Sequence, residues 1–335
     1  MAIDIFNLKP NVVTRDLSGK SFFIYGERKS GKTTTACKFP KPLLIAAEKG
    51  FSAISGIMAQ PVNTWKEALQ VKKQLLEDAE NAKKENRETI FKTVICDTGD
   101  LLYDFCEKYI LTKEGVDSLD ETQLMRGYRM LSREYDKFYQ EIVKAGYTLI
   151  VISHATSKTI KENGEKYDKT IPTIPDRGFL VVSRLVDITA YASYETDENG
   201  MTNSMLTMRG NKYLEAGSRY RYTSVQIPFT YQALCDDIAQ AIDKQADDGD
   251  KVVDTANNLF VDQSEAVDFD ETVKAIKAHA VALKNAEKMN LYTKVVEQYL
   301  GKGKQVRECD ESQVDILVLI LDDLRDVIKE NNLEI

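Results

Sequence analysis

The sequence predicts a three-layer α/β domain, with a mostly parallel sheet between helices, followed by a small C-terminal helical domain. Three observations predict this fold. Short apolar runs alternate with helical patterns over residues 21–153, which is typical of parallel crossovers. The first apolar run leads directly into a Gly-x-x-x-x-Gly-Lys-Thr sequence. A polar, acidic stretch then precedes a region of purely helical spacing. We therefore expect domains at 1–245 and 269–335, with an acidic linker at 246–268.

The elements of the first domain follow in order. Apolar runs predict buried strands at 21–25, 43–47, 92–96 and 148–153. Helical patterns predict helices at 33–39, 65–84, 101–111 and 123–145. Beyond His154 a polar segment with a hairpin turn at Gly164 precedes a helix at 179–184, largely antiparallel strands at 186–194, 204–209 and 220–227, and a helix at 229–244. The C-terminal domain is expected to form helices at 270–284, 290–300 and 312–329.

Composition and charge exclude several classes of protein. Hydrophobic residues make up 43% of the chain, as in a globular protein, and no apolar run is long enough to span a bilayer. The start, residues 1–6, lacks the features of a signal peptide, so we expect a cytoplasmic protein. Five scattered cysteines and two histidines argue against a disulfide framework or a zinc site. The net charge of −8 resides in residues 246–335, which carry 11 Lys/Arg and 20 Asp/Glu, so the rest is near neutral.

The segment from Gly26 to Thr33 matches the phosphate-loop pattern at each fixed position. Glycines let the backbone curl so that successive N–H groups point inward at phosphates. Lys32 is expected to pair with the β- and γ-phosphates, and the Thr33 hydroxyl to bind Mg²⁺. ATP and Mg²⁺ are therefore the predicted ligands; a chance match is disfavoured by the flanking strand and helix. The predicted nucleotide-binding residues are Gly26, Glu27, Arg28, Lys29, Ser30, Gly31, Lys32, Thr33 and Thr34.

Three polar residues end predicted strands near this loop. Asp97 is expected to contact magnesium through water. As an alternative it caps the next helix, a role that Thr98 and Asp100 could share. Glu48 is the candidate general base for the attacking water, with a plain surface position as the alternative. His154 is the candidate sensor of the γ-phosphate, or else a structural histidine.

These residues together resemble the RecA-like ATPase core, a P-loop NTPase fold. In that family the strand after the phosphate loop ends in an Ala-Glu pair whose glutamate is the catalytic base, and Glu48 matches it. The magnesium aspartate of the family matches Asp97. The family ends its next core strand with a polar pair, usually Asn-Gln, that couples the γ-phosphate to a DNA-binding loop; here the pair is Ser153-His154. The passage 183–188 also resembles the family. The resemblance implies hydrolysis of ATP to ADP and phosphate.

More closely, residues 15–235 resemble the compact phage ATPases of the Sak type, which are encoded beside single-strand-binding proteins in recombination modules. The segments 39–45 and 152–154 carry this resemblance. It implies binding of single-stranded DNA, strand annealing or exchange, ATP hydrolysis stimulated by DNA, and assembly into homo-oligomeric rings or filaments. For a bacteriophage protein it also implies location in the host bacterial cytoplasm.

The segment 154–177 falls where the family has its DNA-contacting loop. Its cations could follow a phosphate backbone, and its tyrosine could stack on a base. Glu162, Glu165 and Asp168 dilute this charge, so a solvated hairpin is the alternative. The loop 112–122, at the family's other DNA position, is acidic, and we expect little from it. The candidate DNA contacts are Lys158, Lys161, Lys166, Tyr167, Lys169 and Arg177.

Arg209 and Lys212 lie where the family has cations that reach the γ-phosphate of a neighbouring subunit. Arg219 and Arg221 compete for this role, and surface charges are the alternative for all four. The acidic C-terminal domain is expected to dock a protein, for example a single-strand-binding protein, rather than DNA.

Other functional classes fit less well. A P-loop kinase normally carries an Arg-rich lid, whereas 154–177 is Lys-rich. A regulatory GTPase needs Asn-Lys-x-Asp, and 211–214 reads Asn-Lys-Tyr-Leu. An ATP-switched loader, in which hydrolysis times a protein partner, stays open as the main alternative.

Overall fold

The computed structural model describes residues 13–122, 125–196, 198–249, 252–253, 269–310, 313–331 and 333. The chain divides into two compact units, one within Leu8–Asp262 and the other within Gln263–Ile335. Most of the predicted linker lies outside the described residues. In the described part of this linker, β12 (Val252–Val253) forms a parallel pair with β1 (Val13–Thr14), near the start of the first unit. The first unit therefore continues past the boundary expected at residue 245.

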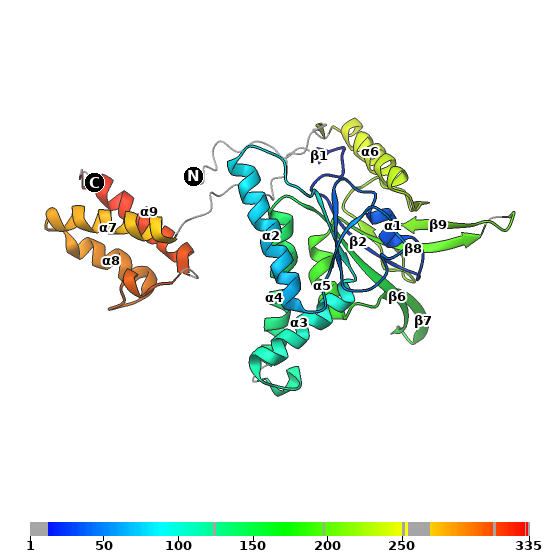
Figure 1. The fold of residues 1–335 in the computed structure, drawn as a ribbon, viewed down its shortest axis with the longest axis horizontal. Coiled ribbons are helices and arrows are strands. Elements are labelled where there is room, and N and C mark those ends of the chain that lie inside the picture. The colour runs from blue at the N-terminus through cyan, green and yellow to red at the C-terminus, as the bar shows by residue number, and fades with distance from the viewer. Residues whose placement is uncertain are drawn as a thin grey trace. The chain divides into compact units, whose positions relative to one another are not determined.

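The first unit is built on a mostly parallel sheet of ten strands, counted over the described residues (Figure 1). The strand order is β11-β9-β8-β2-β6-β5-β3-β4, with β10 paired to β8 and β7 paired to β6. The parallel part comprises β2 (Ser21–Gly26), β3 (Pro42–Ala46), β4 (Met58–Pro61), β5 (Thr93–Asp97), the first half of β6 (Thr148–Glu162) and β8 (Ile188–Thr196). The antiparallel additions are β7 (Glu165–Pro172), β9 (Thr202–Thr207), β10 (Gly217–Ser218) and β11 (Gln226–Pro228).

Helices cover both faces of this sheet (Figure 1). One face packs against α2 (Trp65–Lys84), α3 (Gly99–Glu114), α4 (Arg126–Lys144) and α5 (Asp176–Leu185). The other packs against α1 (Lys32–Ala36) and α6 (Tyr231–Asp247). Strand β2 serves both cores, because Phe23 and Tyr25 point to the first face and Phe22 and Ile24 to the second. In the described part of the chain, no helix combines the length and apolar character needed to cross a bilayer.

The expected fold class is confirmed, and most predicted elements agree with the structure to within a few residues. Three differences have physical causes. The edge strand β4 escaped prediction because all four of its residues are exposed or partly exposed, so no buried apolar run marks it. The stretch 220–227 forms strand only at its end, because carbonyls of its first part bind the Arg209 guanidinium instead of a ladder partner. Apart from these differences, residues 123–124 of the helix expected at 123–145 lie outside the described residues.

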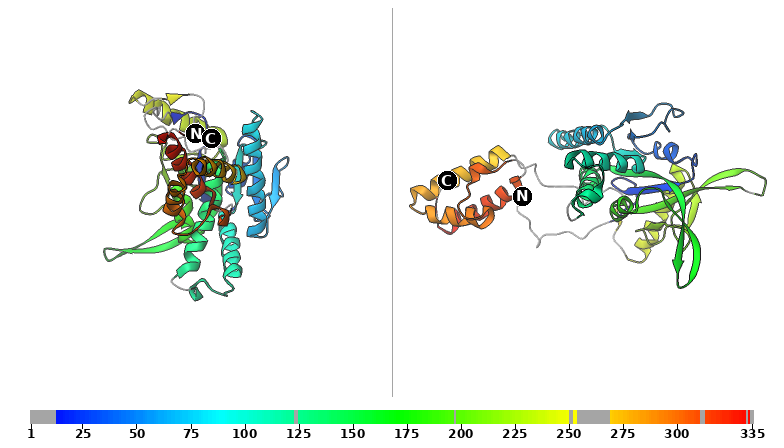
Figure 2. Two further views of the ribbon diagram at one scale, coloured as in Figure 1. Left: turned by 90° about the vertical axis from the view of Figure 1, so that its left-hand side faces the viewer. Right: turned by 90° about the horizontal axis from the view of Figure 1, so that it is seen from below.

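The third difference concerns β6, which does not end at Ser153. It continues to Glu162 and turns at Asn163-Gly164 into β7, so one strand belongs first to the core and then to a hairpin. This β6–β7 hairpin projects beyond the three layers in both views (Figures 1 and 2). Gly164 has φ +84° and Asn163 has φ +52°, the left-handed values that a two-residue hairpin turn requires.

The second unit consists of α7 (Phe269–Asn285), α8 (Met289–Leu300) and α9 (Val314–Glu330) around its own apolar core. The three helices agree with the sequence prediction. Residues of the apolar stripe on α9 fill the centre of this core, among them Leu317, Ile320 and Leu324, each 0% exposed. Their spacing of three and four residues explains why one face of α9 is buried.

Candidate active site

The phosphate loop joins the end of β2 to the start of α1. Lys29 and Gly31 have φ +65° and +85°, so the backbone curls around a concave path. Within the described residues, the amides of Arg28, Lys29 and Gly31 have no protein acceptor. A side chain on Gly26 would approach the Ala192 carbonyl oxygen of β8 to 2.0 Å, so only glycine fits there. The loop therefore offers free amide donors to an anion, as the motif predicts.

Lys32 lies inside this loop and is 6% exposed. Its ammonium group donates hydrogen bonds to the carbonyls of Gly26 at 3.0 Å and Glu27 at 2.7 Å. An ammonium group has three protons, so one remains for a phosphate oxygen. Burial lowers the pKa of Lys32, while the nearby carboxylates of Asp97 and Glu48 act in the opposite direction. The lysine is thus held in position for the phosphates by the loop itself.

Thr33 and Asp97 are joined across the sheet edge. The Thr33 hydroxyl donates to Asp97 Oδ2 at 2.7 Å, and Asp97 is 2% exposed at the end of β5. Thr98, not Asp97, caps α3, because its hydroxyl accepts a hydrogen bond from the Leu101 amide. Hydroxyl and carboxylate oxygens are the ligands that Mg²⁺ prefers. The pair therefore fits a magnesium ion bound beside the phosphates.

Glu48 and His154 meet above the same edge, although β5 lies between the strands that carry them. His154 Nε2 lies 3.5 Å from Glu48 Oε2, and both side chains are about one-third exposed or less, at 29% and 34%. The hydrogen bond with His154 is the main cause that lowers the pKa of Glu48, so this carboxylate is ionised at neutral pH. The Nδ1 atom of His154 is buried and has no partner among the described residues. An ionised, half-exposed carboxylate is suited to accept a proton from water.

The pKa values of the Glu48 and Asp97 carboxylates are shifted in opposite directions. Burial raises the pKa of Asp97, and the charge of Glu48 adds to this rise, while the hydrogen bond from Thr33 opposes it. A side chain placed on Gly50 would meet Glu48 Oε1 at 3.6 Å and Asp97 Oδ2 at 3.8 Å, so the two carboxylates flank one narrow space. A divalent cation there would relieve the burial cost of Asp97.

Sequence reasoning considered Asp100 only as a helix cap, and the structure gives it a different position. Asp100 Oδ1 accepts a hydrogen bond from the Ser153 hydroxyl at 3.0 Å and another from the Thr173 hydroxyl at 2.5 Å. The Thr173 amide also donates to the His154 carbonyl at 3.0 Å. Asp100 therefore ties the start of α3 to both strands at the base of the β6–β7 hairpin. The Ser153-His154 pair was the only sequence signal near this contact.

Tyr25 is a second residue that sequence reasoning missed. It is 0% exposed in β2, next to the phosphate loop. Its hydroxyl lies 2.7 Å from the Glu215 carbonyl and 3.2 Å from that of Thr170 in β7. The strand of the phosphate loop is thus linked to the hairpin and to the turn 210–216. As part of an apolar strand, Tyr25 was read from the sequence as core alone.

The predicted DNA contacts separate into two groups. Cross-strand partners share a face of the hairpin, which puts Lys158, Tyr167 and Lys169 on one face and Lys161 and Lys166 on the other. On the first face, Lys158 pairs with Asp176 at 3.1 Å, Lys169 pairs with Glu215, and the Tyr167 hydroxyl donates to Glu162 at 3.1 Å.

The cations on the second face form no such ion pairs within the described residues. Lys161 and Lys166 are exposed and have no carboxylate partner in the described part of the chain. Arg177 lies outside the hairpin, on α5, where its guanidinium stacks over the Tyr128 ring at 4.5 Å. The six candidates therefore do not form one continuous surface, and Lys161 and Lys166 are the pair available to phosphates.

The two candidate trans cations also differ. The Arg209 guanidinium donates to the carbonyls of Thr223, Tyr220 and Arg221, so within this subunit it fastens the loop after β10. Lys212 is exposed at the tip of the turn 210–216. Its ammonium group lies near the rings of Tyr167 and Tyr213.

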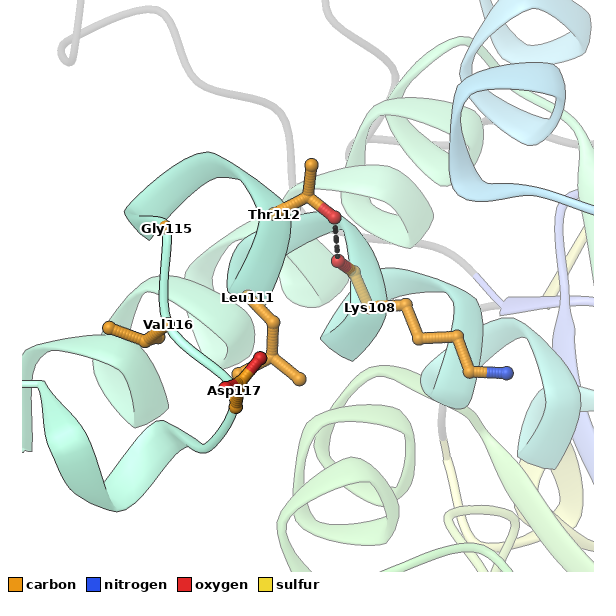
Figure 3. A pocket seen from close by; sticks show the side chains of 6 residues that line it. All are labelled: Lys108, Leu111, Thr112, Gly115, Val116 and Asp117. Carbon is orange, nitrogen blue, oxygen red and sulfur yellow. Dashed lines mark hydrogen bonds between the residues drawn. The ribbon is translucent and has the colours of Figure 1, made fainter.

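A shallow pocket lies away from these residues, at the C-terminal end of α3 (Figure 3). Its walls come from one helix turn and the loop that follows, namely Lys108, Leu111, Thr112, Gly115, Val116 and Asp117. Because α3 begins beside Asp97 and rises about 1.5 Å per residue, its length separates this pocket from the phosphate loop by roughly 20 Å. The pocket therefore does not belong to the nucleotide site.

Comparison with known proteins places this chain in a family. A family model described as an AAA domain matches residues 18–220. The SPbeta prophage-derived uncharacterized protein YorG of Bacillus subtilis (strain 168) is 31% identical over 342 residues, covering 98% of this chain and 100% of that protein. Among solved structures, the KaiC-like protein PH0186 from Pyrococcus horikoshii OT3 aligns with a TM-score of 0.34 and 11% identity over 63% of this chain and 85% of that chain. This structural similarity is too weak to support a conclusion about function.

Proposed function

The chain belongs to the AAA-domain family, and on this premise we propose that it is an ATPase that couples ATP hydrolysis to the binding of single-stranded DNA. The chain contains a RecA-like P-loop domain of the ATPase type, as its sheet order, phosphate loop and family show. The kinship with a prophage-derived protein supports a role in a phage, and strand annealing or recombination is the setting that we propose for it.

The nucleotide chemistry follows from the residues at the sheet edge. The free amides of the phosphate loop and Lys32 would hold the phosphates of ATP, and Thr33 and Asp97 would hold Mg²⁺. The metal, when bound, supplies charge neutralisation at the phosphates. Glu48, ionised beside His154, would take the proton from the attacking water, and His154 would register the γ-phosphate from the adjacent strand.

One observation carries the link to DNA: the continuity of β6. His154 sits opposite Gly26 of the phosphate loop in the β2–β6 register, and the same strand runs on into the hairpin that bears Lys161 and Lys166. A shift of His154 would therefore move the hairpin directly. Asp100, through Ser153 and Thr173, holds the two strands together where they leave the sheet. This arrangement supports coupling of the phosphate state to the outer surface of the hairpin.

The proposal includes a homo-oligomer. Among the described residues no arginine forms an ion pair with Glu48 or Asp97, although the charge of Arg28 helps to lower the pKa of Glu48; a cation supplied by a neighbour would complete the site. Arg209 and Lys212 are the candidates for this cation. Isolated subunits should then hydrolyse ATP slowly.

The test is the ATPase rate with and without single-stranded DNA. Oligodeoxythymidylate and a duplex of the same length are added to the full chain at low salt, with Lys32→Ala as the background, while particle size is followed by light scattering. We expect the single strand to raise the rate and the particle size, and the duplex to do so less. If no DNA binds and the rate is unchanged, the DNA function fails.

That failure would favour an ATP-switched loader that acts on a protein. The second unit is the observation in its favour, because it is acidic and folds around its own core. A single-strand-binding protein is the partner we would test first. Full chain and a chain ending at residue 262 would be compared for binding to it; equal binding would remove the docking role of the helices.

A further inference from the structure

The turn 210–216 between β9 and β10 is held more firmly than an ordinary surface loop. The Thr170 amide of β7 donates to the Tyr213 carbonyl at 2.8 Å, and the Glu215 amide donates to the Thr170 carbonyl at 3.2 Å. Within the turn, the Tyr213 amide donates to the Asn211 side chain at 2.8 Å. A side chain on Gly210 would approach the backbone of the turn to 2.6 Å, so the bend is tight. The backbone around Tyr213 is therefore fixed against the β6–β7 hairpin.

This fixed backbone presents an aromatic ring to solvent. Tyr213 is 51% exposed, although its main chain is hydrogen-bonded on both sides. Its ring meets that of Tyr167 edge to face, with centroids 5.7 Å apart and planes at 86°. The Lys212 ammonium lies 4.9 Å from the Tyr213 centroid and 5.3 Å from the Tyr167 centroid. Two rings and a cation thus form one cluster, which we call the Tyr213 platform.

Most carboxylates near the Tyr213 platform form an ion pair or accept a hydrogen bond. Glu215 pairs with Lys169, and Glu162 accepts the Tyr167 hydroxyl. Asp168 lies on the opposite face, with Lys161 and Lys166, and accepts the Thr159 hydroxyl at 2.6 Å. Residues 155–172 and 209–216 together contain six Lys/Arg and four Asp/Glu. The hairpin and the turn are therefore net basic in a chain whose formal charge is −8. Such a surface attracts a polyanion that also carries flat apolar groups.

We propose that the Tyr213 platform stacks an unpaired base of single-stranded DNA. The inference rests on the proposed function and assigns it a contact that the family resemblance does not. Every base has a π-face, so a ring held at a fixed angle binds it without regard to sequence. The Lys212 ammonium, which lies near both rings, neutralises the phosphate next to the stacked base, and this leaves Arg209 as the cation offered to a neighbouring subunit. Because the ring is fixed before binding, little side-chain freedom is lost when the base arrives.

The occupant must be single-stranded, since paired bases hide their faces in the duplex stack. The two cations on the opposite face of the hairpin, Lys161 and Lys166, have no carboxylate partner within the described residues and lie within a strand's width of the platform. A backbone that crosses the hairpin edge would meet them one or two nucleotides from the stacked base. The platform fixes a base and these lysines fix phosphates, which predicts binding with little sequence preference.

The test uses an oligodeoxythymidylate that contains one 2-aminopurine, whose fluorescence falls when it stacks. The full chain with ATP and magnesium is titrated into this probe, and affinity and quenching are read together. Tyr213→Ala should weaken binding about 5- to 150-fold and relieve the quenching. Tyr213→Phe should behave as wild type, and Tyr213→Leu as Tyr213→Ala. Tyr194→Ala, which removes a tyrosine that is 37% exposed on the neighbouring β8–β9 hairpin, is the matched control.

Each outcome decides something. If wild type binds the probe and Tyr213→Ala binds equally well, the platform is wrong and the proposed function survives. If Tyr213→Leu matches wild type, the contact is apolar packing, and the stacking assignment fails. If Tyr213→Ala alters particle size but not binding of the probe, the surface joins copies of the chain and the inference also fails. If wild type does not bind the probe, the proposed function falls and the platform falls with it. Melting curves confirm that each variant is folded.

Discussion

Replacing Tyr25 by phenylalanine removes one hydroxyl from the centre of the first unit and leaves its ring in place. The ring keeps its contact with Tyr191, whose centroid is 5.3 Å away. Burial raises the pKa of Tyr25 well above the usual range, so its hydroxyl keeps the proton that it donates. The Glu215 carbonyl, 2.7 Å away, therefore loses a donor. The Thr170 carbonyl is less affected because it also accepts from the Glu215 amide at 3.2 Å.

The magnitude follows from this difference. The partly buried Glu215 carbonyl loses its donor, which costs about 1–2 kcal/mol in the free energy of unfolding. For a unit of this size, that corresponds to a fall of roughly 2–8 °C in the melting temperature. The missing hydrogen bond should also weaken the local contact between the hairpin and the turn. The amides of Thr170 and Glu215, which join the hairpin to the turn, should exchange with solvent about tenfold faster.

The assay is hydrogen exchange together with thermal melting, on wild type and two variants. Tyr147→Phe is the matched control, because the Tyr147 hydroxyl donates to the Leu75 carbonyl at 2.8 Å and the residue is 1% exposed. It should lower the melting temperature by a similar amount without changing exchange at Thr170 or Glu215. Unchanged exchange at both amides in Tyr25→Phe, or equal acceleration in the control, would refute the view that this hydroxyl holds the hairpin and turn to the phosphate-loop strand.

Four further predictions concern the edge of the sheet and the hairpin. Glu48→Gln should bind ATP but hydrolyse it about 10²- to 10⁴-fold more slowly in single-turnover experiments; turnover at the wild-type rate would remove Glu48 as the base. His154→Asn removes the main cause that lowers the pKa of Glu48, so that pKa rises, and the acid limb of the pH–rate profile should move to higher pH. The pKa of Asp97 is raised in the folded protein, so its contribution to stability is present at low pH and is lost as the pH rises through that value. Asp97→Asn should therefore raise the melting temperature without nucleotide at pH 7 while abolishing magnesium-dependent stabilisation by ATP, and a lower melting temperature would contradict the argument. Replacing Lys161 and Lys166 by alanine should reduce the salt slope of binding to single strands by about 1.4, whereas replacing Lys158 and Lys169, which are in ion pairs, should change it less.

The sequence carried enough information for the phosphate loop because the signal is local. Gly26 to Thr33 is contiguous, and the apolar strand before it and the helix after it are its immediate neighbours. Asp97 and Glu48 could be proposed for the same reason, since each directly follows an apolar run. The edge at which these residues gather follows from parallel strands, whose carboxyl ends meet on one side.

Contacts between distant segments could not be predicted in this way. Asp100 meets Ser153 and Thr173 across 53 and 73 residues of sequence, and Tyr25 meets Glu215 across 190. None of these pairs leaves a periodic signal. The extension of β6 was missed because the strand leaves the core at His154, where its apolar pattern stops although its hydrogen-bond ladder continues. A hairpin exposed on both faces has no reason to alternate.

The short pairing of β1 with β12 brings together the points where the chain enters and leaves the first unit. Paired strands lie about 4.8 Å apart, so Val13 and Val252 could be bridged by a linker of a few residues. The unit is thus nearly a closed ring of polypeptide, and its sequence could be reopened at the tip of the β8–β9 hairpin without breaking a core strand. Such a circular permutant would retain the whole sheet edge. The nearness of its two ends also means that this unit could be inserted into another protein as a single P-loop domain.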